Sequence, residues 1–190
     1  AIEFMSLIGS GAGAIGAEKA FMCNGANMAF RKSIFSSTKQ HIASGDDVFL
    51  LHHVKQSNGK IAFVKEQSAI VFTSPKESVT EFINQRKRWA SKSSSYTDAT
   101  AQWISVVVFL TNFLILLLLF TANFKLFLVL FFTKVLIDYR FVKSLSQFFF
   151  YEKYLSYYWL MSFLYPIYIV WVAFSSQLSS FEWKERLFKR

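Results

Sequence analysis

The longest uncharged segment of the chain sets the strongest constraint on its fold. The segment "WISVVVFLTNFLILLLLF" runs from Trp103 to Phe120 without an acidic or basic side chain. A helix of about 20 apolar residues spans the hydrocarbon core of a bilayer. We therefore expect a transmembrane helix at these residues.

Two further apolar segments follow. Leu126–Ile137 is interrupted by Lys134, and Asp138 stands one helical turn beyond, which lets the two side chains pair on one helix face. Residues 154–176 carry no charge and are rich in Tyr and Trp, which favour the membrane interface. We predict two or three transmembrane helices within residues 99–178.

The tail, residues 179–190, alternates aromatic and basic side chains and predicts a short amphipathic helix on the membrane surface. Three complete crossings would place this basic tail and the basic segment before the first helix on opposite sides. Either the middle segment is re-entrant or interfacial, or the tail lies outside.

Composition supports a membrane protein and narrows the partners. The 190 residues are 53% hydrophobic and carry a formal net charge of +9. This excess of positive charge suits binding to an anionic membrane surface or to an anionic substrate. Nucleic acid is not the expected partner. The single cysteine, Cys23, excludes an internal disulfide and a multi-cysteine metal site, which fits a cytosolic face.

The first 98 residues look like a globular α/β piece. Apolar side chains alternate in "KIAFVKEQSAIVFT", residues 60–73, and predict one or two strands. Gly11, Gly13 and Gly16 have the G-x-G-x-x-G spacing of a dinucleotide site, but no clear strand precedes them. We interpret this segment as a mobile loop and keep it as a candidate for a position near a ligand.

Two adjacent carboxylates open a predicted helix in "SGDDVFLLHHVKQSNGK", which starts at Ser44 and stops at Asn58-Gly59. Asp46 and Asp47 fit helix capping, at about 0.3 to 1 kcal/mol each. They also fit a general base presented at the helix start. His52 and His53, further along this helix, are interpreted as packing or surface residues because they lack metal-ligand spacing.

A second helix is predicted to start at "SPKE", with Ser74 as N-cap, and to run into "QRKRW". Gln85, Arg88 and Trp89 fall within an arc of about 100° on one face. Arg86 and Lys87 point elsewhere and are available to lipid headgroups.

Three motifs in this order, "CNGANMAFRK", "SGDDVFLLH" and "QRKRW", resemble the second half of membrane-bound family 2 glycosyltransferases, the group of cellulose and hyaluronan synthases. The resemblance implies an α/β fold: the second half of a GT-A catalytic domain at residues 1–98, followed by the membrane region 99–178 and the tail. It also implies inverting sugar transfer from a nucleotide-sugar donor to a lipid-linked or polysaccharide acceptor.

The resemblance implies the site residues as well. Asp47 matches the general base and Asp46 its neighbour. Arg88 would bind the diphosphate and Trp89 would stack on a sugar ring. The residues expected to bind substrate are Gln85, Arg88, Trp89, Asn24, Gly25 and Asn27.

One part of the family pattern is missing. No Asp-x-Asp motif occurs in the 190 residues. The resemblance therefore implies that Mg²⁺ or Mn²⁺ is held by an earlier half-domain, that this chain alone is inactive, and that it carries no metal ligand itself. It places the protein in a bacterial inner membrane with its catalytic part in the cytoplasm.

Two other functions compete with this interpretation. A non-enzymatic membrane subunit, such as a transporter or assembly component, would use the two carboxylates as a helix cap and "QRKRW" as a basic anchor. A membrane-bound oxidoreductase would use Gly11, Gly13 and Gly16, but it needs a strand before them.

Overall fold

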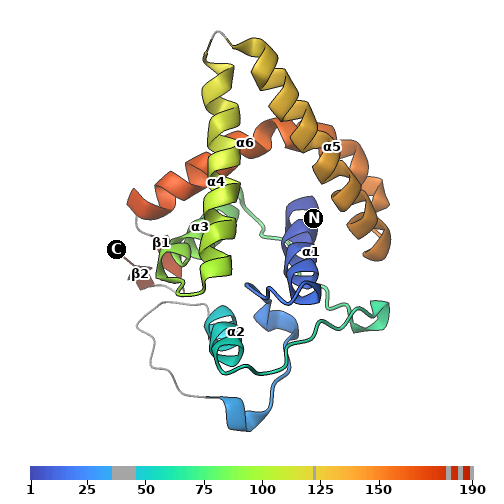
Figure 1. The fold of residues 1–190 in the computed structure, drawn as a ribbon, viewed down its shortest axis with the longest axis vertical. Helices are drawn as coiled ribbons and strands as arrows, with labels where there is room; N and C mark the ends of the chain where they lie inside the picture. Colours follow the sequence, from blue (N-terminus) through green and yellow to red (C-terminus); the bar gives the residue numbers. More distant parts are fainter. Residues whose placement is uncertain (36–45, 122, 179–180, 184–185, 189–190) are drawn as a thin grey trace. The chain divides into compact units, whose positions relative to one another are not determined.

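The computed structural model forms two compact units (Figure 1). One contains residues 1–10 and 105–171, and the other contains residues 11–104 and 172–190. Three helices continue from one unit into the other: α1 (Ile2–Gly16), α4 (Ala99–Leu119) and α6 (Tyr158–Leu178). The structure describes residues 1–35, 46–121, 123–178, 181–183 and 186–188.

The predicted α/β fold, the second half of a GT-A domain, is wrong. The described parts of residues 1–98 hold α1, α2 (Asp46–Gln56) and α3 (Val79–Ser91), and no strand. Short 3-10 helices lie between them: η1 (Gly25–Asn27), η2 (Lys32–Ile34), η3 (Gln67–Ala69) and η4 (Ser93–Ser95).

The described strands lie in the tail, where a helix was predicted. β1 (Phe181–Trp183) and β2 (Arg186–Phe188) pair antiparallel, with Phe181 opposite Phe188. Alternation of apolar and charged residues fits both a short helix and a short strand, so pairing decided between them. The amphipathic-helix interpretation of the tail is therefore corrected to a hairpin.

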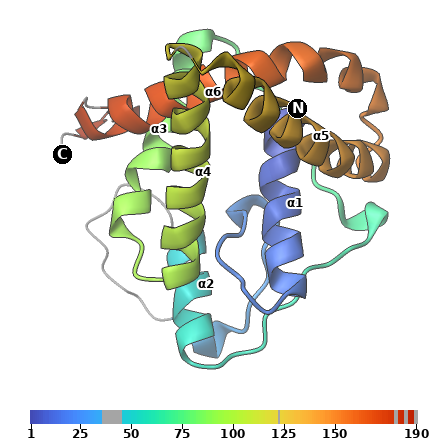
Figure 2. The same cartoon turned by 45° about the horizontal axis from the view of Figure 1, so that its top comes forward.

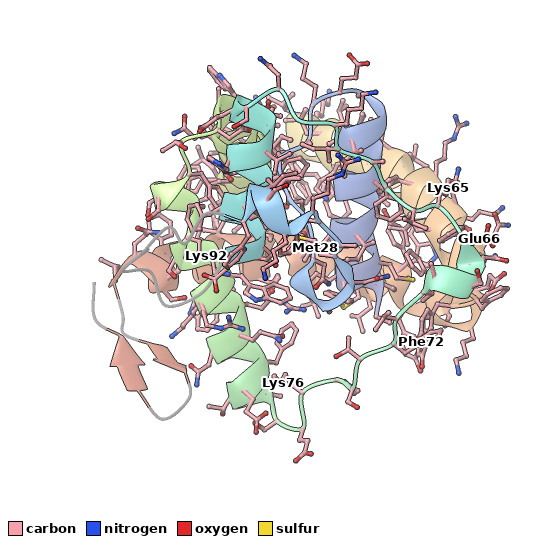
Figure 3. The ribbon with its side chains drawn as sticks, turned by 90° about the horizontal axis from the view of Figure 1, so that it is seen from below. Met28, Lys65, Glu66, Phe72, Lys76 and Lys92 are labelled. Atoms are coloured by element: carbon pink, nitrogen blue, oxygen red, sulfur yellow. The ribbon has the colours of Figure 1, made fainter. Side chains whose placement is uncertain are left out.

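The segment from residue 60 to 78 explains why the strand prediction failed. Its backbone is extended at Glu66 and Ile70, as a strand requires. It pairs with no strand among the described residues, and Val71 and Phe72 are 56% and 66% exposed. Figure 3 shows it as a long connection carrying Lys65, Phe72 and Lys76. Alternation predicts an extended chain, but a sheet also needs a partner for the backbone groups.

The glycine-rich segment is helical rather than a loop. Gly11, Gly13 and Gly16 all belong to α1. A Cβ at Gly9 would lie 2.5 Å from the side-chain methyls of Leu145, so a larger residue there would require the Leu145 side chain to shift. The low helix propensity of glycine made the segment look like a loop, and packing overrides that propensity. The dinucleotide interpretation loses its strand-to-helix turn.

The predicted helix at the two carboxylates is confirmed, and the predicted start of the next helix is not. α2 ends where expected, with Asn58 in the left-handed region (φ 52°) and the Gly59 N–H donating to the Val54 carbonyl at 2.8 Å. Ser44 and Gly45 lie outside the described residues.

α3 is capped by Ser78, whose Oγ accepts the Glu81 N–H at 3.1 Å, instead of by Ser74. "SVTE" is also a capping box, and local sequence did not separate the two.

The first unit is a helical assembly around an aromatic core. α4 is followed by α5 (Phe124–Phe148), and the two meet at their joined ends in Figure 1. α5 supplies most of the core residues. α6 follows α5 in the chain (Figure 2). The Tyr158 hydroxyl at the start of α6 donates to the Val135 carbonyl of α5 at 2.6 Å. The buried core residues are Ile115, Phe127, Phe131, Val135, Val142 and Tyr158.

Two helices among the described residues are long and apolar enough to cross a membrane: Ala99–Leu119, and Glu152–Leu178, in which the 3-10 turn η5 (Glu152–Tyr157) leads into α6. Trp103 and Val107 are 69% and 57% exposed, as lipid contact requires. These helices match the predicted first and third segments.

The middle helix, α5, is not one of these two, because charged side chains interrupt it. Lys134 and Asp138 form the predicted ion pair. The Lys134 ammonium also lies 5.2 Å from the centre of the Tyr165 ring on α6. Each charge of the pair is therefore neutralised by the other, and the contact between Lys134 and Tyr165 helps to join α5 to α6.

In the second unit, Lys55 ties α2 to the start of α4. Its ammonium donates to Asp98 Oδ2 at 2.6 Å, to the Ala20 carbonyl at 2.9 Å and to Thr100 Oγ1 at 3.3 Å. Asp98 Oδ1 accepts the Ala101 N–H at 2.9 Å and so caps α4. One carboxylate therefore both begins the first membrane-length helix and fixes it to α2.

We expect Asp98→Ala to lower the free energy of unfolding by about 2 kcal/mol, because it removes a helix cap and a charge-assisted hydrogen bond. Burial opposes ionisation of Asp98, but hydrogen bonds from Lys55 and the Ala101 N–H outweigh it and hold the pKa below its usual value. This stabilisation is complete above the carboxyl's unfolded pKa of about 3.9 and is lost as the pH falls through the lower folded pKa.

Urea denaturation in detergent, followed by circular dichroism at pH 7 and at pH 2 to 4, measures this effect. Glu77→Ala is the control, because Glu77 is exposed. Equal stability losses in the two variants at pH 7 would contradict the role of Asp98.

Candidate functional site

The Asp47 carboxylate is the centre of the candidate site. Its Oδ2 accepts the Gly25 N–H and its Oδ1 accepts the Val48 N–H, both at 2.9 Å. Asp47 is half-buried, whereas its neighbour Asp46 is exposed. The two backbone donors fix the carboxylate's orientation, and each oxygen keeps a second lone pair. Asp47 is thus positioned to accept a further hydrogen bond or a proton.

The turn at Gly25 brings the chain against Asp47. Asn24 Oδ1 accepts the Ala26 N–H at 3.0 Å and stabilises this turn. A Cβ on Gly25 would lie 3.2 Å from Asp47 Cβ and Oδ2, so a glycine gives the backbone its close approach. Asn27 Nδ2 donates to the Ala69 carbonyl at 2.7 Å. Both amides therefore hold the turn, and substrate binding by them stays a prediction.

Cys23 lies behind the same carboxylate. Its Sγ donates to the Asp47 backbone carbonyl at 3.2 Å and lies 3.8 Å from Met28 Sδ. Burial, followed by the negative charge of Asp47, raises the pKa of the thiol to about 12. The thiol is therefore protonated near neutral pH and is a poor nucleophile.

Aromatic rings close the base of the site. His52 is buried, with Nε2 2.9 Å from the Phe21 carbonyl, and its ring packs edge-on against Phe49 and Tyr96. This confirms that His52 is a packing residue, and His53 is exposed. Burial, with Asp47 as the next cause, raises the pKa of Tyr96 to about 12. The charge of Asp47 therefore reaches the ring cluster of Phe49, His52 and Tyr96.

Two cations of α3 share the field of Asp47. Burial lowers the pKa of Arg88, and the negative charge of Asp47 partly offsets this. Burial also lowers the pKa of Lys92, again opposed by Asp47, while the positive charge of Arg88 adds to the lowering. The structure therefore brings together Asp47 and Arg88, which belong to separate sequence motifs.

Lys92 is a residue that sequence reasoning missed. It is 8% exposed and lies one turn after Arg88, at the end of α3. The i, i+4 spacing was the available signal. Burial is not visible in such a local pattern.

The remaining residues of "QRKRW" contact one another. Arg86 is 8% exposed and its guanidinium lies 4.5 Å from the centre of the Phe82 ring and 4.3 Å from that of Trp89. Its Nη1 donates to Gln85 Oε1 at 2.8 Å. The expectation that Arg86 faces lipid headgroups is therefore wrong, because stacking between two rings stabilises a buried guanidinium. Gln85 and Trp89 contact this arginine, and their role in substrate binding stays a prediction.

The described residues hold no group of three or more His, Cys, Asp or Glu side chains that could bind a metal ion. The expected Mg²⁺ or Mn²⁺ concerned a half-domain outside these 190 residues, and it stays a prediction. Asp47 and Asp46 are the carboxylates whose negative charge opposes the lowering of the Lys92 pKa.

Comparison with known proteins assigns no family to the chain. No protein family, curated protein or solved structure matches it. The likeness to family 2 glycosyltransferases therefore stays a resemblance of three short motifs. The function has to be argued from the geometry around Asp47.

The electrostatic contact between Asp47 and Cys23 can be tested with the single thiol of the chain. With its pKa at about 12, the thiol should react with iodoacetamide at pH 8.5 about a thousandfold more slowly than free cysteine, because its thiolate fraction is about a thousandfold smaller. Asp47→Asn should accelerate the reaction severalfold, because it removes the nearby charge while burial remains.

Mass spectrometry of the protein in detergent follows this alkylation over time. Asp46→Asn is the matched control, because Asp46 is exposed and is not among the causes of the raised thiol pKa. Equal rates in the two variants would show that the charge of Asp47 does not reach the thiol.

Proposed function

We propose that this chain forms the acceptor-side part of a membrane-bound, inverting glycosyltransferase. The observation that carries the proposal is that the Arg88 guanidinium lies within the electric field of Asp47, so that a carboxylate and a cation from separate helices share one region: the charge of Asp47 raises the pKa of Arg88 against the larger lowering by burial. A base and a phosphate-binding cation at one place are what sugar transfer from a nucleotide donor requires. The helical fold of these residues gives the proposal no support, so it depends on this site alone.

The reaction follows from these two side chains. Asp47 accepts the proton of an acceptor hydroxyl as the hydroxyl oxygen bonds to the anomeric carbon. The bond between that carbon and the donor's phosphate oxygen breaks, and the electron pair leaves with the nucleoside diphosphate. Arg88 stabilises the negative charge that gathers on this leaving group. Attack opposite to the leaving group inverts the anomeric configuration.

The position of the site fits an acceptor at a membrane. α3 ends at Ser91, and α4, one of the two membrane-length helices, begins at Ala99. A lipid-linked sugar or a growing polysaccharide would meet Asp47 near the bilayer surface. A bacterial inner membrane, with this unit in the cytoplasm, is part of the proposal.

A second candidate is a non-enzymatic membrane subunit. It is favoured by the contacts of the motif residues, because Asn24, Asn27, Gln85 and Trp89 all contact other residues of the protein, and Asn27 reaches the distant Ala69 carbonyl. In that case Asp47 anchors the turn at Gly25 to α2 and does no chemistry. Loss of Asp47 would then change stability and leave no turnover to measure.

We expect Asp47→Asn to lower kcat by about 10² to 10⁴-fold, the usual contribution of a general base. The assay uses membranes that contain the longest reading frame including this chain, with Mg²⁺ and a panel of sugar nucleotides. It follows release of nucleoside diphosphate.

Asp46→Asn is the matched control and should retain most of the activity, since Asp46 is exposed and it is Asp47 that accepts the Gly25 N–H. Similar losses in both variants, or no release with any donor, would argue for the non-enzymatic subunit.

A further inference from the structure

Residues 60–66 form an extended, exposed segment between the end of α2 and the 3-10 helix η3. The backbone at Glu66, just before η3, is extended, with φ −131° and ψ 128°. The apolar side chains of Phe63 and Val64 are 38% and 69% exposed. The exposed residues of the segment are Lys60, Ala62, Phe63, Val64, Lys65 and Glu66. Figure 3 shows Lys65 and Glu66 on this connection.

The backbone of this segment has no hydrogen-bonded neighbour. In the described part of the chain, no hydrogen bond involves a backbone group of residues 60–65, and the Glu66 carbonyl accepts the Ala69 N–H of η3. An extended chain that offers free N–H and C=O groups beside exposed apolar side chains is a template for a further strand. The segment therefore has the properties of an interaction surface.

The sequence of this segment, "KIAFVKE", is complementary to itself in the antiparallel direction. When two copies pair about a two-fold axis, the register centred on Phe63 is the one that pairs residues 60–66 over their whole length. This register places Lys60 of each copy opposite Glu66 of the other. Opposite charges that face one another across two strands stabilise the pairing.

The apolar residues meet in the same register. Phe63 faces Phe63 of the second copy at the axis, and Ala62 faces Val64. Side chains alternate between the faces of a strand, so both ion pairs share one face with the aliphatic pairs, while the Phe63 rings meet on the other. Lys65 faces Ile61, which the methylene groups of the lysine can cover.

We propose that residues 60–66 of two copies of this chain pair as antiparallel strands about a two-fold axis at Phe63. A second copy is the occupant because the length of the segment, its charges and its apolar residues all agree on one symmetric register. The inference goes beyond the proposed function and does not depend on it. A ribbon of two strands is only marginally stable by itself, so we expect a weak dimer that forms as concentration rises.

The second extended part of the connection, residues 70–77, supplies a control. Val71 is apolar and 56% exposed, as the residues of the proposed strand are. Pro75, however, has no N–H to donate to a neighbouring strand. Val71 therefore lies on the same connection but outside the proposed pairing.

Cross-linking tests the position of the axis. In a Cys23→Ala background, Phe63→Cys places two thiols opposite one another, at the Cα separation of about 4.5 to 5.5 Å that a disulfide accepts. Proteoliposomes are oxidised and the chains are separated on a non-reducing gel. Phe63→Cys should give about fivefold more covalent dimer than Val71→Cys, because only its thiols share a paired position. Equal yields from the two variants would overturn the proposal.

Charge exchange tests the register without a disulfide. Lys60→Glu should weaken the dimer Kd about tenfold in sedimentation equilibrium in detergent, because an attraction at each end of the ribbon becomes a repulsion. Combining Lys60→Glu with Glu66→Lys should return the Kd to within about threefold of the original, since the pairs form again with their signs exchanged.

Lys32→Glu is the matched control for charge, because Lys32 is also exposed and its replacement changes the net charge equally. It should change the Kd by less than about twofold. A Kd that Lys60→Glu leaves unchanged, or that the double exchange fails to restore, would assign the dimer to another surface and overturn the proposal. A chain that stays monomeric at every concentration would overturn it as well.

Hydrogen exchange shows whether a different strand occupies the segment. In the proposed dimer, the amides of every second residue within 60–66 become protected as the protein concentration rises, since alternate residues form the bonds of a two-stranded ladder. Protection of these amides in a monomer would mean that another segment covers them, which contradicts pairing with a second copy.

Discussion

The hydrogen bonds of the Asp47 carboxylate organise the second unit. They hold the turn at Gly25 against the start of α2 and leave the carboxylate half-buried. Its charge then acts on the thiol of Cys23, on the Tyr96 hydroxyl and on the cations at the end of α3. Because charges interact strongly where water is excluded, one fixed carboxylate sets the electrostatic character of the whole site.

Arg88 on α3 and Lys92 just after its end share this field. Burial lowers the pKa of both cations, and the negative charge of Asp47 opposes this lowering. Arg86 is instead stabilised between two aromatic rings. Cations within a few residues of one another are thus compensated in different ways, by a distant carboxylate or by neighbouring rings.

Local sequence signals predicted those features whose cause is local. The uncharged segment at α4, the end of α2 at Asn58-Gly59 and the pairing of Lys134 with Asp138 all depend on residues within a few positions of one another. The α/β fold and the glycine loop failed for the opposite reason, because each required knowledge of which distant segment, if any, would pack beside it. The cap at Ser74 failed because a second capping box follows at Ser78.

The sequence by itself determined that the chain has membrane-length apolar helices and that Asp47 opens a helix, because length, charge and capping are properties of neighbouring residues. Only the tertiary structure decided that the alternating segment after α2 forms no sheet with another described segment, that Arg86 is buried between rings, and that Lys92 lies within the field of Asp47. Burial and long-range electrostatics arise when segments far apart in the chain meet, and no local pattern contains them.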